Sequence, residues 1–274
     1  MTLKFIGRGG AFAPISIGNS NMLFISDSGK RMLFDCGTTT PYIYRDEMGL
    51  DFKDIDAVYI THQHGDHIGG LEMFAFCRYF MPLKDSVNGT TIRPKLFAMR
   101  SLMKDLWDHS LRGGLESLQG RIMSLTDYFD CRPISDNRSF DWEDYRFTPI
   151  QTVHVRSGYI IKHSYGLGIS KLIPVSYKKP QGNKITNNYY DAYITSDTQF
   201  DMGLMEYYNK SKLIFNDCET TTFKSHVHPN YADLNTLPLD IKNKMWLYHY
   251  GEKIASVTDD GFAGFVNKGQ EFIF

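Results

Sequence analysis

Residues 61–70 read Thr-His-Gln-His-Gly-Asp-His-Ile-Gly-Gly, which places three imidazoles and one carboxylate within six positions. Neutral imidazole and carboxylate are ligands of first-row transition metals. The mostly apolar run at 55–60 predicts a buried strand in front of them, and an apolar helical pattern follows the two glycines. We therefore expect the ligands on the loop at the carboxyl end of a strand, where open α/β sheets place their ligands.

The chain has 274 residues, and no repeat, low-complexity tract or break in composition divides it. We therefore predict a single domain over residues 1–274. Its 42% hydrophobic and 22% charged residues are typical of a soluble globular protein. The formal net charge of −1 provides no overall field that would attract long nucleic acid.

Four cysteines without C-x-x-C spacing favour a reducing cytoplasm over an oxidising compartment. No apolar run approaches the ~20 residues that span a bilayer. We therefore expect a cytoplasmic protein that does not contact membranes.

Further candidate ligands lie far along the chain and share one local pattern. His154, Asp197 and His249 each come at the end of an apolar strand pattern. Because parallel strands bring their carboxyl ends to one edge of a sheet, we expect these side chains to meet the histidine motif there.

The spacing suggests two metal ions. His62 and His64 lie two apart on an extended segment, so both side chains point one way, and His154 completes a three-histidine site. The remaining two motif ligands form a second site with His249. Asp197 is the natural bridging carboxylate between ions ~3.5–4 Å apart. The predicted metal ligands are His62, His64, Asp66, His67, His154, Asp197 and His249.

Two other features of the sequence lead to structural expectations. Asp35 follows an apolar strand pattern, and it either supports the metal ligands from behind or caps a turn. Residues 159–161 and 167–173 are expected to form a hairpin with His163 in its turn.

The ordered set of His62-x-His64-x-Asp66-His67 and the three later ligands resembles the metallo-β-lactamase superfamily. The resemblance implies an α/β fold, a four-layer αβ/βα sandwich with two mixed sheets. It also implies a di-metal hydrolytic site, usually with zinc and here with manganese as the alternative. Asp66 within the motif favours two metals and would also orient the attacking water.

Three short stretches look like the ribonuclease Z branch of phosphodiesterases in that superfamily. They are residues 3–7, 18–20 and 34–37, and a Ser-Tyr-Gly at 164–166 adds to the likeness. In that branch a further histidine, held by an acidic residue, donates a proton to the leaving oxygen.

The resemblance places this acid in the loop before the last ligand. His226 and His228 precede His249 by 23 and 21 residues, and Asp217 matches the acidic partner by position. We narrowly favour His226 as the proton donor, because His228 precedes Pro229, which restricts its backbone.

The long Gly/Pro- and Lys-rich arm that grips tRNA in this branch is not evident, and the polar loop at 178–188 is too short to replace it. A small substrate is therefore favoured. Residues 9–14 and 226–228 look similar to the phage anti-Pycsar nucleases and their bacterial relatives. That resemblance implies a homodimer that hydrolyses 3′,5′-cyclic nucleotides to 5′-monophosphates, against immune signalling in the host cytoplasm if a phage encodes it.

Two other activities of the same superfamily remain open on sequence alone. One is endonuclease cleavage at the 3′ end of tRNA. The other is hydrolysis of a lactone or a β-lactam.

Overall fold

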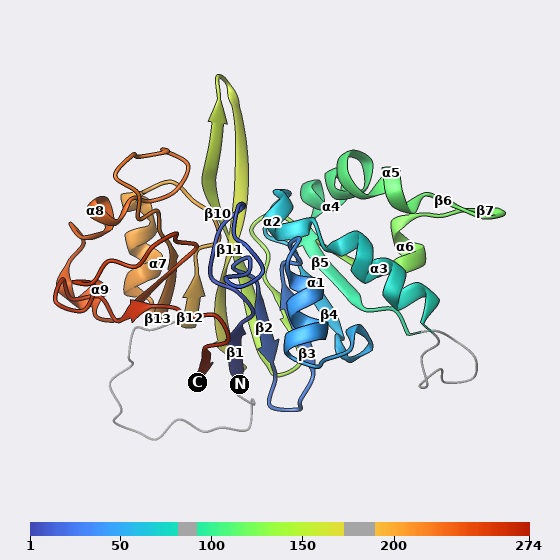
Figure 1. Cartoon of the computed structure of the whole chain (residues 1–274), viewed down its shortest axis with the longest axis horizontal. Helices are drawn as coiled ribbons and strands as arrows, with labels where there is room; N and C mark the ends of the chain where they lie inside the picture. Colours follow the sequence, from blue (N-terminus) through green and yellow to red (C-terminus); the bar gives the residue numbers. More distant parts are fainter. Residues whose placement is uncertain (82–91, 173–189) are drawn as a thin grey trace. The chain divides into compact units, whose positions relative to one another are not determined.

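The computed structural model describes residues 1–81, 92–172 and 190–274, and the predicted loop at 178–188 lies outside them. The described chain forms two compact units, Met1–Asp136 with Val266–Phe274, and Asn137–Phe265. Among these residues each unit contains its own mixed seven-stranded sheet together with helices (Figure 1). The predicted α/β class with two mixed sheets is confirmed, and the assignment to a single domain stays a prediction.

In the first unit the strand order is β16-β1-β2-β3-β4-β5-β8. Neighbours from β16 to β3 run antiparallel, and those from β3 to β8 run parallel. Strands β2 and β3 form a hairpin, with Leu23 opposite Leu33. The strands are β1 (Thr2–Phe5), β2 (Met22–Ile25), β3 (Arg31–Phe34), β4 (Ala57–Tyr59), β5 (Lys95–Met99), β8 (Asp130–Ile134) and β16 (Glu271–Ile273).

The predicted helix after the histidine motif is confirmed as α3 (Leu71–Phe80). The helix that follows β5 begins as α4 (Arg100–Leu106) and continues as a wider π-helical turn, Trp107–Leu111. The other elements of this unit are α1 (Thr40–Tyr42), the helical turns Ile43–Glu47 and Phe52–Asp54, α2 (Gly65–Ile68), α5 (Arg112–Leu115), β6 (Ser117–Leu118), β7 (Arg121–Ile122) and α6 (Leu125–Tyr128).

In the second unit the strand order is β15-β14-β13-β12-β11-β10-β9. The four strands from β12 to β15 are parallel, and those from β9 to β12 are antiparallel. The strands are β9 (Phe140–Trp142), β10 (Tyr145–Ser157), β11 (Ile160–Lys171), β12 (Tyr190–Ile194), β13 (Ser211–Asp217), β14 (Met245–Tyr248) and β15 (Gly264–Phe265). The helices are α7 (Met205–Asn209), α8 (Tyr231–Leu234) and α9 (Leu239–Lys242), with a helical turn at Met202–Leu204.

The expected hairpin between 159–161 and 167–173 is wrong. Strand β11 runs unbroken beside β10, and the two project together as a long finger (Figure 1). His163 lies within β11 opposite Val153, not in a turn. A β-carbon on Gly166 would lie 2.4 Å from the carbonyl oxygen of Ile194. This glycine therefore allows β12 to approach β11. It does not lie in a turn, as the sequence suggested.

Helix α3 packs an aromatic face into the core of the first unit. Phe74 is fully buried. Its ring stacks on Phe129 at a centroid distance of 6.1 Å and meets Phe52 edge-on at 5.4 Å. Phe52 in turn stacks on Tyr44 at 5.7 Å.

Among residues 1–81, 92–172 and 190–274, no helix is long and apolar enough to cross a membrane.

We predict that Phe74→Ala lowers the free energy of unfolding by about 3–5 kcal/mol, because it removes a buried ring that its neighbours cannot replace. Phe80→Ala is the matched control: it lies on the same helix but is 62% exposed. The control should change stability by less than about 0.5 kcal/mol. Urea unfolding of both variants measures the difference, and equal midpoints would contradict this account of the core.

Candidate metal centre

The predicted site residues divide between the two units. The first cluster consists of His62, His64, Asp66 and His67. The second cluster consists of His154, Asp197, Asp217, His228 and His249.

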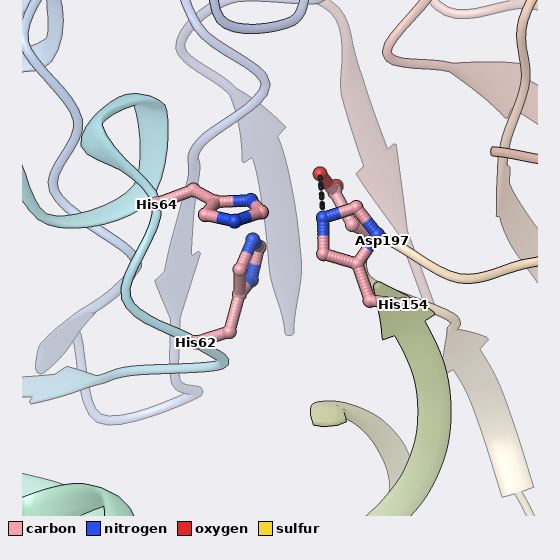
Figure 2. Close-up of side chains that lie close together, drawn as sticks. All are labelled: His62, His64, His154 and Asp197. Atoms are coloured by element: carbon pink, nitrogen blue, oxygen red, sulfur yellow. Dashed lines mark ion pairs between the residues drawn. The ribbon is translucent and has the colours of Figure 1, made fainter. Parts of the chain in front are cut away.

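The first cluster follows β4, as the sequence predicted, and ends in α2. The ring of His62 meets that of His64 nearly edge-on, with centroids 4.8 Å apart (Figure 2). It also lies 4.0 Å from the ring of His67. His62, Asp66 and His67 are buried, and His64 is half-buried. Three imidazoles and a carboxylate are thus gathered on one short loop.

A close backbone contact holds this loop in place. A β-carbon on Gly37 would lie 1.9 Å from the carbonyl oxygen of Asp66, so only glycine fits there. Asn21, at the edge of β2, bonds both sides of that contact: its side chain donates to the Asp66 carbonyl at 3.0 Å and accepts from the Gly37 amide at 2.6 Å. The loop after β3 and the start of α2 are therefore fixed against each other.

Asp35 supports the cluster from behind, which decides between the two roles that the sequence left open. Its backbone is left-handed, with φ of 63°. One carboxylate oxygen lies 2.6 Å from Nδ1 of His67. Because a carboxylate only accepts, Nδ1 carries a proton, and in the neutral ring Nε2 therefore presents its lone pair. That Nε2 lies 3.4 Å from Oδ2 of Asp66.

Thr61 extends this control to a second imidazole. Its amide and its hydroxyl both donate to Asp35, at 2.8 and 2.7 Å. The hydroxyl has a single proton, so it must accept from Nδ1 of His62, which lies 3.0 Å away. His62 therefore also presents Nε2. Sequence reasoning missed Thr61, although a hydroxyl residue directly before the first histidine was a visible signal.

Three residues of the second cluster lie at or just beyond the carboxyl ends of three adjacent parallel strands. Asp217 is the last residue of β13, Asp197 follows β12 and His249 follows β14. His249 has a left-handed backbone, with φ of 65°, as does Ser196, with φ of 55°. Such strained positions gather at functional sites. His154 comes instead from within β10, at a bulge between residues 153 and 155, and not from beyond a strand end as predicted.

His154 and His249 both face one oxygen of Asp197. Nδ1 of His154 donates to the carbonyl oxygen of Val227 at 3.0 Å, and its Nε2 lies 3.6 Å from Oδ2 of Asp197 (Figure 2). Burial lowers the pKa of His154 and so favours the neutral ring. Nε2 of His249 lies 3.4 Å from the same oxygen.

These separations fit metal ligands. Two ligands held 2.0–2.1 Å from a tetrahedral ion lie about 3.3 Å apart. The nitrogen–oxygen distances at His67, His154 and His249 are 3.4, 3.6 and 3.4 Å. At His67 and His154 a nitrogen lone pair faces a carboxylate, which is repulsive unless a cation lies between them. The donor set therefore suits a divalent metal ion in both clusters.

His228 differs from these ligands because it pairs directly with an acid. Its Nδ1 lies 2.7 Å from Oδ2 of Asp217, a hydrogen-bond distance shorter than the spacing of two metal ligands. Burial lowers its pKa, but Asp217 and then Asp197 and Glu219 outweigh burial and raise the pKa of His228 to about 10. The imidazole is therefore protonated at neutral pH.

His226, which the sequence narrowly favoured as the acid, is exposed and has a φ of 61°. The carboxylate of Asp217 binds His228 instead. The loop that carries both is closed at its base, where the Glu219 amide donates to the Pro229 carbonyl at 2.8 Å. The geometry thus favours His228 over His226.

Residues 1–272 match the family model of the anti-Pycsar protein Apyc1. The chain belongs to this family. The anti-Pycsar protein Apyc1 of Paenibacillus harenae is 34% identical over 258 residues, which cover 93% of this chain and 91% of that protein. The anti-Pycsar protein Apyc1 of Bacillus phage vB_BveM-Goe7 is 29% identical over 282 residues, covering 99% and 97%.

The solved structure of the metallo-beta-lactamase fold protein YhfI from Bacillus subtilis is similar to this chain, with a TM-score of 0.68. The two chains are 14% identical, and the match covers 99% of this chain and 98% of YhfI. The metallo-β-lactamase fold predicted from the ordered histidines and aspartates is therefore confirmed, as is the family.

We predict that Thr61→Val weakens zinc binding by about 10–100-fold, because valine keeps the shape of threonine but cannot link Asp35 to His62. Thr61→Ser keeps the hydroxyl and should retain most of the affinity. Competition with a chromophoric chelator measures both variants. Equal zinc affinities for the valine and serine variants would contradict the role of this hydroxyl.

Proposed function

We propose that the two clusters act together to hold two divalent metal ions, with zinc the first candidate and manganese the second. We further propose that the protein hydrolyses 3′,5′-cyclic mononucleotides to 5′-monophosphates. Membership of the anti-Pycsar family supports this substrate class. The observation that supports the phosphodiester chemistry is the pair of a buried Asp217 and a half-buried His228, next to the proposed metal ligands of the second cluster.

The ligand assignment follows the sequence-based division. The first metal takes His62 and His64 with His154, and the second takes the other two ligands of the first cluster with His249. Asp197 is assigned to both ions, because His154 and His249 approach the same oxygen of its carboxylate. The hydrogen bonds that Asp35 and Thr61 accept from Nδ1 of His67 and of His62 support this assignment, since they leave Nε2 of both imidazoles as the atom that can bind a metal.

When bound, two such ions lower the pKa of a shared water from ~15.7 toward ~7 and stabilise charge on phosphate oxygens. Asp66 lies beside Nε2 of His67, and we assign it the role of orienting the attacking water. The water adds its oxygen to phosphorus, the bond from phosphorus to the 3′ oxygen breaks, and the 5′-monophosphate remains.

His228 is assigned as the proton donor to the departing 3′ oxygen. Asp217 keeps its imidazole protonated and holds Nδ1, which leaves Nε2–H to donate. The ring of His228 lies 4.7 Å from that of His249 and 5.2 Å from that of His154, so the proton is held next to the proposed ligands. Action as a homodimer in the cytoplasm is proposed with this function.

We expect purified, metal-replete protein to contain about two equivalents of zinc or manganese per chain and to hydrolyse cyclic mononucleotides. It should not cleave a tRNA precursor, a lactone or a β-lactam offered in the same panel. Protein treated with a chelator should lose activity and regain it on adding either metal. Metal content by mass spectrometry below one equivalent per chain would rule out the di-metal proposal.

We expect His228→Ala to lower kcat for a cyclic nucleotide by about 10²–10⁴-fold while metal content is retained, because general acid catalysis is lost. His226→Ala is the matched control, since it changes an exposed histidine of the same loop. It should keep most of the turnover. Full activity of the His228 variant, or equal losses in both variants, would refute the assignment.

A further inference from the structure

A cavity of about 380 Å³ lies in the first unit, and none of its lining residues belongs to the first cluster. Its walls come from the end of α3, the chain before β5, β7 and α6. The volume lies within the range of small-molecule sites, ~300–1,000 Å³. Three of the described lining residues are arginines, namely Arg78, Arg93 and Arg121.

Arg78 places a buried positive charge at this cavity. The residue is 6% exposed. One terminal nitrogen donates to the carbonyl oxygen of Lys53 at 2.7 Å, and the other donates to that of Ile92 at 3.1 Å. Its Nε is buried, and among residues 1–81, 92–172 and 190–274 it has no hydrogen-bond partner. Neutral carbonyls hold the guanidinium, and burial lowers its pKa, so a nearby anion would stabilise it.

The other two arginines add charge that a single carboxylate does not balance. Arg121 donates to Asp127 at 2.7 Å, and Asp127 also caps α6 by accepting from Ser124. Arg93 is exposed and donates to the carbonyl oxygen of Thr126. The lining thus has three guanidinium groups and one carboxylate. Guanidinium groups bind phosphate through paired, charge-assisted hydrogen bonds.

An aromatic wall adjoins these charges. The rings of Tyr79 and Tyr128 contact each other at a centroid distance of 5.4 Å. The Tyr128 hydroxyl is used within the unit, where it donates to the carbonyl oxygen of Leu115. Tyr79 is half-buried and lines the cavity, so it forms part of the surface that a ligand would meet. Aromatic faces beside arginines suit a molecule that carries both a planar ring and a phosphate.

We propose that this cavity is a second ligand site, which binds a nucleoside monophosphate. The three arginines bind the phosphate, and the base packs against Tyr79. The inference stands on residues of the first unit alone and does not require the proposed hydrolysis.

The test is a calorimetric titration of AMP into the full-length, zinc-loaded protein, with inorganic phosphate and adenosine as comparison ligands. We expect saturable AMP binding that is tighter than binding of phosphate or adenosine. The variant Arg93→Gln/Arg121→Gln should lose at least one AMP-binding event or weaken it by about 10-fold or more, as expected for removing two charge-assisted contacts.

Arg132→Gln is the matched control for position 121. Both arginine side chains are 55% exposed and pair with an aspartate at 2.7 Å, but Arg132 does not line the cavity. This control should bind AMP like the unchanged protein, and all variants should keep the same thermal unfolding temperature.

Three results would overturn the proposal: no saturable AMP binding, equal binding by the double variant and the unchanged protein, or AMP binding no tighter than phosphate. Cyclic-nucleotide turnover by the double variant is recorded in parallel and should be unchanged. A failure of hydrolysis in every sample would count against the proposed function without affecting the AMP result.

Discussion

The histidine motif depends on one buried carboxylate, that of Asp35. It binds Nδ1 of His67 directly and that of His62 through the hydroxyl of Thr61. Hydrogen bonds to a charged group contribute about 1.5–3 kcal/mol each, so these contacts hold both rings in one tautomer and one orientation. The carboxylate reaches them because Asp35 leaves β3 with a left-handed backbone, and its amide donates to the carbonyl oxygen of Tyr59 in the neighbouring strand.

In the second unit, as at Asp35, left-handed residues just after strand ends bring the side chains of the cluster together. Parallel strands end side by side, and the chain turns sharply beyond them, at Ser196 after β12 and at His249 after β14. These turns put Asp197 and His249 next to Asp217 at the end of β13. Asp217 then binds His228 from the following loop. One row of strand ends thereby provides two of the proposed ligands, Asp197 and His249, and the carboxylate that binds the proposed acid.

The sequence predicted the parts that local patterns determine. The apolar run at 55–60 located β4, the helical pattern after the two glycines located α3, and the position after a strand located Asp197 and His249. The errors concern contacts that are distant in sequence. Gly166 resembled a turn residue but allows the approach of Ile194. His154 lies at a bulge where the pairing of β10 with β11 shifts. The apolar pattern of one strand gives no information about such a shift.

The choice between His226 and His228 shows the same limit. Pro229 restricts the backbone of the residue before it, which is a local rule, and it counted against His228. Asp217, eleven positions earlier, binds the imidazole of His228 through its carboxylate, and this distant contact supports the proposal of His228 as the acid. The sequence around Asp35 is likewise compatible with support of the metal ligands and with capping of a turn, and its contact with His67 distinguishes the two.

The left-handed backbone of His249 restricts which residues can replace histidine at that position. Aspartate and asparagine adopt positive φ several-fold more readily than most residues, whereas β-branched and bulky side chains resist it. An exchange from imidazole to carboxylate would therefore keep the turn after β14, and it would change the charge of the cluster without rebuilding the chain. Replacement of the proposed ligand is accordingly easier at His249 than at His154, where the side chain depends on the register of two long strands.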